Sequence, residues 1–80
     1  MDRDEVKTEV RDAMREVFNR DDLEINDDMT ADDIEEWDSM EHITLIFSLE
    51  SRFGIKFKTE EIGGIQNVGE FINVISAKLN

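Results

Sequence analysis

A serine hydroxyl at the start of a helix is the feature of this chain best suited to chemistry. The run Trp37-Asp38-Ser39-Met40 ends an acidic stretch and leads into an apolar pattern with helical spacing. Asp38 is a good N-cap, and Glu41 completes a pair like a capping box. Ser39 is therefore expected at the first helical position, where unpaired backbone N–H groups and the helix dipole favour a phosphate. Another enzyme could esterify such a hydroxyl, although the same residues also suit an ordinary helix start.

The sequence offers little to an enzyme acting alone. It contains a single His and no Cys. His42 follows Ser39 by one helical turn, but no third group is evident to orient its imidazole. We therefore expect no catalytic residue, and we expect His42 to face solvent or to contact a partner.

A calcium loop is an alternative, because oxygen-bearing side chains alternate along the acidic stretch. The series comprises Glu24, Asn26, Asp28, Thr30 and Asp32, with Glu35 in the twelfth position. Met29 stands where such a loop needs Gly, and there is no second loop to pair with this one. We expect no specific metal site, and a non-catalytic calcium-binding or docking helical module remains the alternative from another class.

Charge is distributed unevenly along the chain. The 80 residues carry 21 acidic and 9 basic side chains, a formal net charge of −12. Twelve of the acids, and no Lys or Arg, lie between Arg20 and Arg52. Such a segment repels nucleic acid and anionic membranes and attracts proteins with basic patches. We expect it to be a docking surface.

Length and composition set further limits. A chain of 80 residues fits one small domain, which we place at residues 1–80. Its charged N-terminus does not resemble a signal peptide, and no apolar run reaches transmembrane length. We expect a cytoplasmic monomer that does not insert into membranes. Because the chain lacks Cys, any thiol chemistry must come from an attached group.

Apolar periodicity predicts where the helices lie. A first helix is expected over residues 4–19, with a stripe formed by Val6, Val10, Ala13, Met14, Val17 and Phe18. Residues 21–38 should form an ordered loop, with one helical turn near residues 30–33, anchored on the helices by Leu23, Ile25, Met29, Ile34 and Trp37. A second helix is expected over residues 39–53, with a core stripe of Ile43, Ile46, Leu49 and Phe53 and with Gly54 as its left-handed C-cap.

The last third of the chain predicts a linker and two more helices. Residues 55–58 should be extended, with Ile55 or Phe57 entering the core. Thr59 should cap a short helix that Gly63 and Gly64 end with a sharp turn. A final helix should start at Asn67, paired with Glu70, and bury Val68, Phe71, Ile72, Ile75 and Leu79. The expected fold is all-α: a small four-helix bundle of three main helices and one short one.

The residues from Asp38 onward resemble the acyl carrier protein family. Its motif is Asp-Ser-Leu, or less often Asp-Ser-Met, opening a helix that ends near a Phe, as Asp38-Ser39-Met40 and Phe53 do here. The likeness continues through Phe57, Glu60-Glu61-Ile62, Ile65 and Val68 to Ile75, and it is weakest over the first third of the chain.

The resemblance implies a function and assigns roles to two residues. Family members carry acyl groups as thioesters on a 4′-phosphopantetheine arm, which here would be attached to Ser39. Asp38 matches the acid that helps the phosphopantetheinyl transferase hold magnesium. The other implied partners are acyl-loading and acyl-processing enzymes with basic docking patches.

Further roles follow for partner contacts and for the acyl chain. The positions implied to contact partners are Met40, Glu41, Phe47 and Glu50. The positions that would shelter the acyl chain are Ile46, Leu49, Ile62, Ile65 and Phe71. Ile62 and Phe71 are bulky where small residues often occur, so we expect long saturated chains to be sheltered poorly.

Departures from the family pattern favour a particular kind of pathway. Thr44 and Ser51 stand where relatives often have Glu, and Arg52 follows. This favours specialised fatty-acid, lipid or polyketide-type synthesis over bulk fatty-acid synthesis. An aminoacyl carrier, either D-alanyl or peptidyl, is the near alternative, although Glu36-Trp37-Asp38 lacks the Gly-Gly lead-in of peptidyl carriers.

Overall fold

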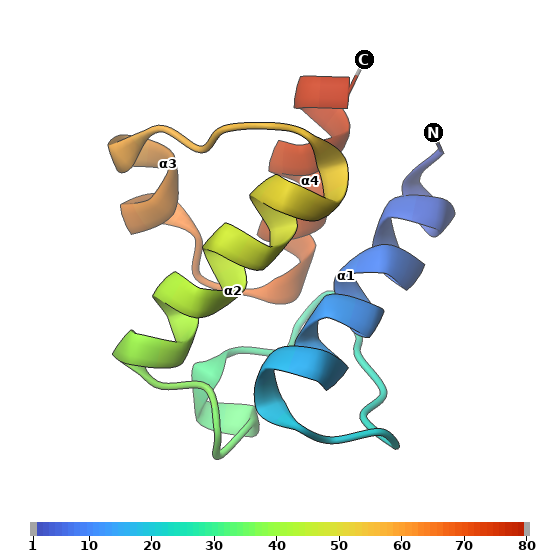
Figure 1. The fold of residues 1–80 in the computed structure, drawn as a ribbon, viewed down its shortest axis with the longest axis vertical. Coiled ribbons are helices and arrows are strands. Elements are labelled where there is room, and N and C mark those ends of the chain that lie inside the picture. The colour runs from blue at the N-terminus through green and yellow to red at the C-terminus, as the bar shows by residue number, and fades with distance from the viewer. Residues whose placement is uncertain (1, 80) are drawn as a thin grey trace.

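Four α-helices and one 3-10 turn make up the fold (Figure 1). A computed structural model describes residues 2–79, so the two terminal residues of the predicted 1–80 domain lie outside it. The elements are α1 (Arg3–Phe18), η1 (Ala31–Asp33), α2 (Ser39–Phe53), α3 (Thr59–Gly64) and α4 (Val68–Leu79). The predicted all-α fold with three main helices and one short helix is therefore confirmed. None of the described helices is long and apolar enough to span a membrane.

Capping residues define the ends of α1. The Asp2 carboxylate accepts a hydrogen bond of 2.9 Å from the Glu5 N–H. Asn19 adopts a left-handed conformation with φ of 55°, and its N–H donates to carbonyl groups of the last turn. Asn19 therefore terminates the helix, which lies one residue earlier at each end than predicted.

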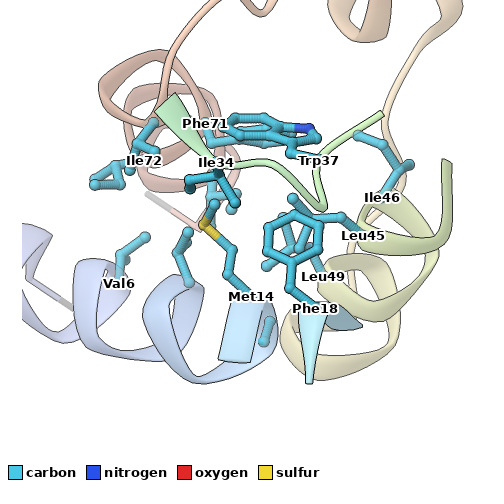
Figure 2. Close-up of a cluster of buried hydrophobic side chains, with 14 of the residues drawn as sticks. Val6, Met14, Phe18, Ile34, Trp37, Leu45, Ile46, Leu49, Phe71 and Ile72 are labelled. Carbon is cyan, nitrogen blue, oxygen red and sulfur yellow. The ribbon is translucent and has the colours of Figure 1, made fainter. Parts of the chain in front are cut away.

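The core combines side chains from α1, α2, α4 and the loop between α1 and α2 (Figure 2). Trp37 of the loop is 5% exposed, and its ring lies 6.1 Å from that of Phe18 and 6.0 Å from that of Phe71 between centroids. Leu23 and Ile34 are also buried, while Ile25 and Met29 pack partly buried against the core. The prediction of an anchored, ordered loop is confirmed.

Helix α2 buries a different stripe from the one predicted. Ile43 is 46% exposed and Phe53 is only partly buried, whereas Leu45 is fully buried beside Ile46 and Leu49. Side chains two positions apart on an α-helix point in directions that differ by about 200°, so Ile43 and Leu45 cannot both face one core. Packing against the other helices favours the Leu45 side, so the predicted place of Ile43 is wrong.

The acidic loop is bonded directly to the start of α4. The N–H groups of Val68 and Gly69 donate to the carbonyl oxygens of Met29 and Asp27, at 2.9 and 3.0 Å. These donors belong to the first turn of a helix, where they have no acceptor within the helix itself. The loop therefore supplies acceptors that α4 lacks.

Asp27 also ties the loop to α1. Its carboxylate lies 2.8 Å from the guanidinium of Arg3 and 3.5 Å from the Lys7 ammonium. The hydrogen bond from Arg3, together with the positive charges of Arg3 and Lys7, holds the pKa of Asp27 below its usual value. Arg3 in turn donates to the Asn73 side chain at 3.1 Å. This network joins the loop, α1 and α4.

The region after α2 differs in detail from the prediction. Gly54 adopts the expected left-handed conformation with φ of 67°, and Phe57 is the linker residue that enters the core. Lys58, not Thr59, is the residue preceding α3, and its N–H donates to the Glu61 carboxylate at 2.7 Å. Helix α3 ends at Gly64, as predicted, but Gly63 and Gly64 are themselves helical and do not form the predicted sharp turn.

Helix α4 begins at Val68, one residue later than predicted. Asn67 caps it, since its side-chain oxygen accepts from the Glu70 N–H at 2.9 Å. Glu70 accepts from the Gln66 N–H rather than from that of Asn67. Val68, Phe71, Ile72 and Ile75 are buried as expected, whereas Leu79 is only partly buried.

Gly69 lies so close to the loop that any larger residue at this position should destabilise the protein. A Cβ at Gly69 would lie 3.1 Å from both the Cβ and the carbonyl oxygen of Asp27. We expect Gly69→Ala to lower the free energy of unfolding by about 1–3 kcal/mol, measured by urea denaturation. Gly63→Ala is the control, because a Cβ there meets nothing within 4 Å, and it should be neutral or stabilise by up to about 1 kcal/mol. Equal midpoints for the two variants would contradict this account of the junction.

Candidate functional site

Ser39 is the first residue of α2, and the residue before it fixes the helix start. Asp38 is in an extended conformation, and its Oδ1 accepts from the Glu41 N–H at 2.8 Å. The first main-chain helical bond runs from the His42 N–H to the Asp38 carbonyl at 2.8 Å. Both Asp38 and Ser39 are exposed. The predicted helix over residues 39–53 is confirmed, and it presents the hydroxyl on a well-defined turn.

His42 was expected to face solvent or to contact a partner, but its side chain is half-buried and is bonded within the protein. Its Nδ1 accepts a hydrogen bond of 3.1 Å from the indole N–H of Trp37. The two rings are stacked, with an interplanar angle of 15° and centroids 6.1 Å apart. The His42 ring also lies 5.6 Å from that of Phe71. Spacing along the chain did not predict this pair, because the contact depends on how the loop before α2 places Trp37 against the first turn of the helix.

An apolar strip follows Ser39 along the outer face of α2. Met40 is 76% exposed and Phe47 is 64% exposed, and Ile43 lies between them on the same face. We name Met40, Ile43 and Phe47 the outer strip. The exposure of Met40 and Phe47 agrees with their expected positions, whereas Ile43 had been assigned to the core. Large exposed apolar side chains in a row are typical of interaction sites.

A surface cleft of about 350 Å³ lies at the C-terminal end of this strip. It is lined by Phe47, Glu50, Ser51, Gly54, Ile55 and Lys56. Glu50 is half-buried, and one of its carboxylate oxygens accepts from the Phe57 N–H at 2.8 Å. Two acids were expected to contact partners. Glu50 is held against the linker, and Glu41 is half-buried in the first turn of α2, beside Ser39.

The residues expected to shelter an acyl chain belong to the core cluster or pack against it. Ile46, Leu49 and Phe71 are buried, and Ile62 and Ile65 pack partly buried against the same cluster. Phe71 is also in edge-to-face contact with Phe57, with centroids 6.3 Å apart. Aromatic rings therefore occupy much of the space next to these residues.

The side chains of the possible calcium loop have other partners. Glu24 is paired with Arg15 at 2.7 Å. The Asn26 side-chain oxygen accepts from the Asp28 N–H at 3.1 Å, and the Thr30 hydroxyl oxygen accepts from the Asp32 N–H at 3.2 Å. Throughout residues 2–79, no three His, Asp or Glu side chains are grouped so that they could hold a metal ion. The geometry gives the calcium alternative no support.

Comparison with known proteins agrees with this fold and indicates a class of small helical carrier domains. The family model described as a phosphopantetheine attachment site matches residues 8–75.

One curated protein and two solved structures are similar to this chain. An acyl carrier protein from Petrotoga mobilis is 31% identical over 80 residues, covering all of this chain and 94% of the relative. The solution structure of a holo acyl carrier protein from Geobacter metallireducens superposes with a TM-score of 0.87 at 34% identity, covering 92% of this chain and 85% of that one. A solved structure from Mycobacterium tuberculosis, at 20% identity, shares the fold with a TM-score of 0.82 over 91% of this chain and 97% of its own.

The chain belongs to the acyl carrier protein family, whose members bear a phosphopantetheine arm and are not catalysts. The expected cofactor and the absence of a catalytic role are thereby confirmed at the level of the family.

Two substitutions at Asp38 separate its role as a cap from its charge. Asp38→Ala removes the acceptor for the Glu41 N–H and should lower the free energy of unfolding by about 1 kcal/mol. Asp38→Asn keeps a good capping side chain, so its free energy of unfolding, measured by urea denaturation, should fall clearly less. Equal losses in the two variants would show that the carboxylate charge, and not the hydrogen bond, stabilises the start of α2.

Proposed function

We propose that Ser39 is the residue that carries 4′-phosphopantetheine through a phosphodiester bond. The observation that carries this proposal is the exposed position of Ser39 at the first residue of α2, directly after the capping Asp38. The other serines described are less suitable: Ser48 and Ser51 lie in the later turns of α2, and Ser76 lies within α4. The Asp-Ser-Met motif of the family selects the same residue.

The local structure fits a phosphate on this hydroxyl. The Glu41 N–H is already bonded to Asp38, and Ser39 and Met40 precede the first main-chain bond of α2. The helix start therefore offers a positive dipole end close to the phosphodiester. When attached, the arm supplies the thiol for thioester formation, which the cysteine-free chain itself cannot provide. Asp38, exposed beside Ser39, is assigned to the magnesium ion of the transferase.

The surface around Ser39 supports a proposal about partners. We infer that phosphopantetheinyl transferases and acyl-loading or acyl-processing enzymes contact Met40, Glu41, Phe47 and Glu50. The outer strip would enter an apolar groove, and the acids near it would attract Lys and Arg at the rim of that groove. The chain would act as a cytoplasmic monomer that shuttles its cargo between these enzymes at high local concentration.

The pathway we propose is specialised fatty-acid, lipid or polyketide-type synthesis. Thr44 and Ser51 are exposed on α2, so partners that rely on Glu at these positions would lose those contacts. Arg52, which follows, bridges Glu9 at 3.1 Å and Glu16 at 2.8 Å on α1, so it withdraws two further acids from docking. An aminoacyl carrier is the alternative, and a test of the loaded group distinguishes the two.

The attachment site is tested by intact-protein mass after incubation with coenzyme A, magnesium and a broad-specificity phosphopantetheinyl transferase. The parent should gain the mass of one phosphopantetheine, and Ser39→Ala should gain none. Ser51→Ala, an exposed serine on the same helix, is the matched control and should be modified like the parent. Modification of Ser39→Ala, or an unmodified parent beside an active control carrier, would refute the assignment.

The crowding around Phe71 predicts which cargo is sheltered. We expect long saturated acyl chains on the arm to leave the methyl resonances of Ile46, Leu49, Ile62 and Ile65 nearly unchanged, because Phe57 and Phe71 fill the space beside them. Methyl NMR spectra of the protein loaded with a long or a short acyl group would measure this. Large shifts that appear only with the long chain would show that a tunnel opens among the helices.

A further inference from the structure

Trp37 and His42 lie on opposite sides of the Asp38–Ser39 junction and are joined through their side chains. The indole N–H of Trp37 donates to His42 Nδ1 at 3.1 Å, and the rings are stacked with an interplanar angle of 15°. The main chain adds a second tie, since the His42 N–H donates to the Asp38 carbonyl at 2.8 Å. The side-chain bond thus closes a ring that contains Ser39.

This ring is fastened to the core. Trp37 packs between Phe18 of α1 and Phe71 of α4, and its main-chain N–H donates to the Ile34 carbonyl at 3.0 Å. The His42 ring packs on the same Phe71. A shift of the Asp38–Ser39 junction would therefore have to move either a buried indole or the first turn of α2.

The bond between Trp37 and His42 requires an acceptor atom at position 42. An indole has one donor and no acceptor, and a neutral imidazole can accept at one nitrogen while it donates from the other. Trp37 is buried, so its N–H would bear a desolvation cost if His42 offered no acceptor. Neither an aliphatic nor a purely aromatic side chain at position 42 would satisfy it.

We propose that the Trp37–His42 pair is a clamp that holds Ser39 in the orientation that the phosphopantetheinyl transferase recognises, with His42 as a positioning residue. The proposal rests on Ser39 as the attachment site. An enzyme that binds only one orientation of the junction gains affinity when that orientation is already populated. Loss of the clamp should therefore raise the transferase KM for this protein and leave kcat unchanged.

The test uses substitutions that keep an aromatic ring at each position and remove the hydrogen bond. Trp37→Phe also shortens a buried side chain that packs on Phe18 and Phe71, so His42→Phe is the more specific of the two. Trp37→Phe lacks the donor, and His42→Phe lacks the acceptor. Each should raise the KM about threefold to tenfold, as expected for one net hydrogen bond. The double variant should have the same KM as Trp37→Phe alone, because His42→Phe then removes a bond that is already absent. His42→Gln, which restores an acceptor, should recover part of the loss.

A spectroscopic signature reports the bond without the transferase. The chain has one Trp, so its indole N–H gives a single resonance, which should move and exchange faster with solvent in His42→Phe. Val6→Ala is the control for general destabilisation. Val6 is fully buried and lies apart from Trp37 in the core cluster (Figure 2), and its truncation should leave both the resonance and the KM unchanged.

The outcomes separate this proposal from the attachment site itself. A parent that is not modified on Ser39 would overturn the assignment of the serine, whatever the indole resonance shows. A modified parent whose KM is unchanged in both single variants, or raised equally by Val6→Ala, would overturn the clamp alone. Additive losses in the double variant would also overturn it, since the two side chains would then act separately.

Discussion

The fold depends on how a highly acidic loop is held against the helices that flank it. The N–H groups of Val68 and Gly69, which no helical acceptor can satisfy, bond to the carbonyl oxygens of Met29 and Asp27. At the C-terminal end of the loop, Trp37 fills the space between α1 and α4. With the middle and the C-terminal end of the loop held in this way, the position of the next residues, Asp38 and Ser39, is fixed as well. The Ser39 hydroxyl is thus located by a polar junction and an aromatic anchor that lie outside its own helix.

Ion pairs also hold the acidic loop against α1. The loop contains no basic residue, and its cations come from α1 and its C-terminal extension: Arg3 and Lys7 pair with Asp27, Arg15 with Glu24, and Arg20 with Glu36. Exposed ion pairs of this kind each contribute little to stability. Their effect on the distribution of charge is larger, because they neutralise the part of the loop that faces α1. Asp38 and Glu41, on either side of Ser39, have no such counter-ion among the ion pairs described, so negative charge is concentrated where partners would approach.

Helix α2 serves two surfaces at once. Leu45, Ile46 and Leu49 pack into the core, while Met40, Ile43 and Phe47 form the outer strip. Apolar residues on two faces make such a helix less amphipathic than α1, whose core stripe is unambiguous. The exposed part of the outer strip contributes little to the stability of the isolated chain, and exposed apolar side chains in a row are typical of interaction sites.

Local signals in the sequence determined the helices and placed Ser39 at the start of α2. Caps and apolar spacing act between residues at most about four positions apart, which is why Asp38, Gly54 and the stripe of α1 could be interpreted directly. The anchors of the loop were also recognisable as large apolar side chains in an acidic segment. Only the tertiary structure decided whether Ile43 or Leu45 is buried, that Gly63 and Gly64 stay helical, and that His42 accepts a bond from Trp37. Each of these depends on which groups from other elements fill the space beside a residue, and spacing along the chain does not contain that information.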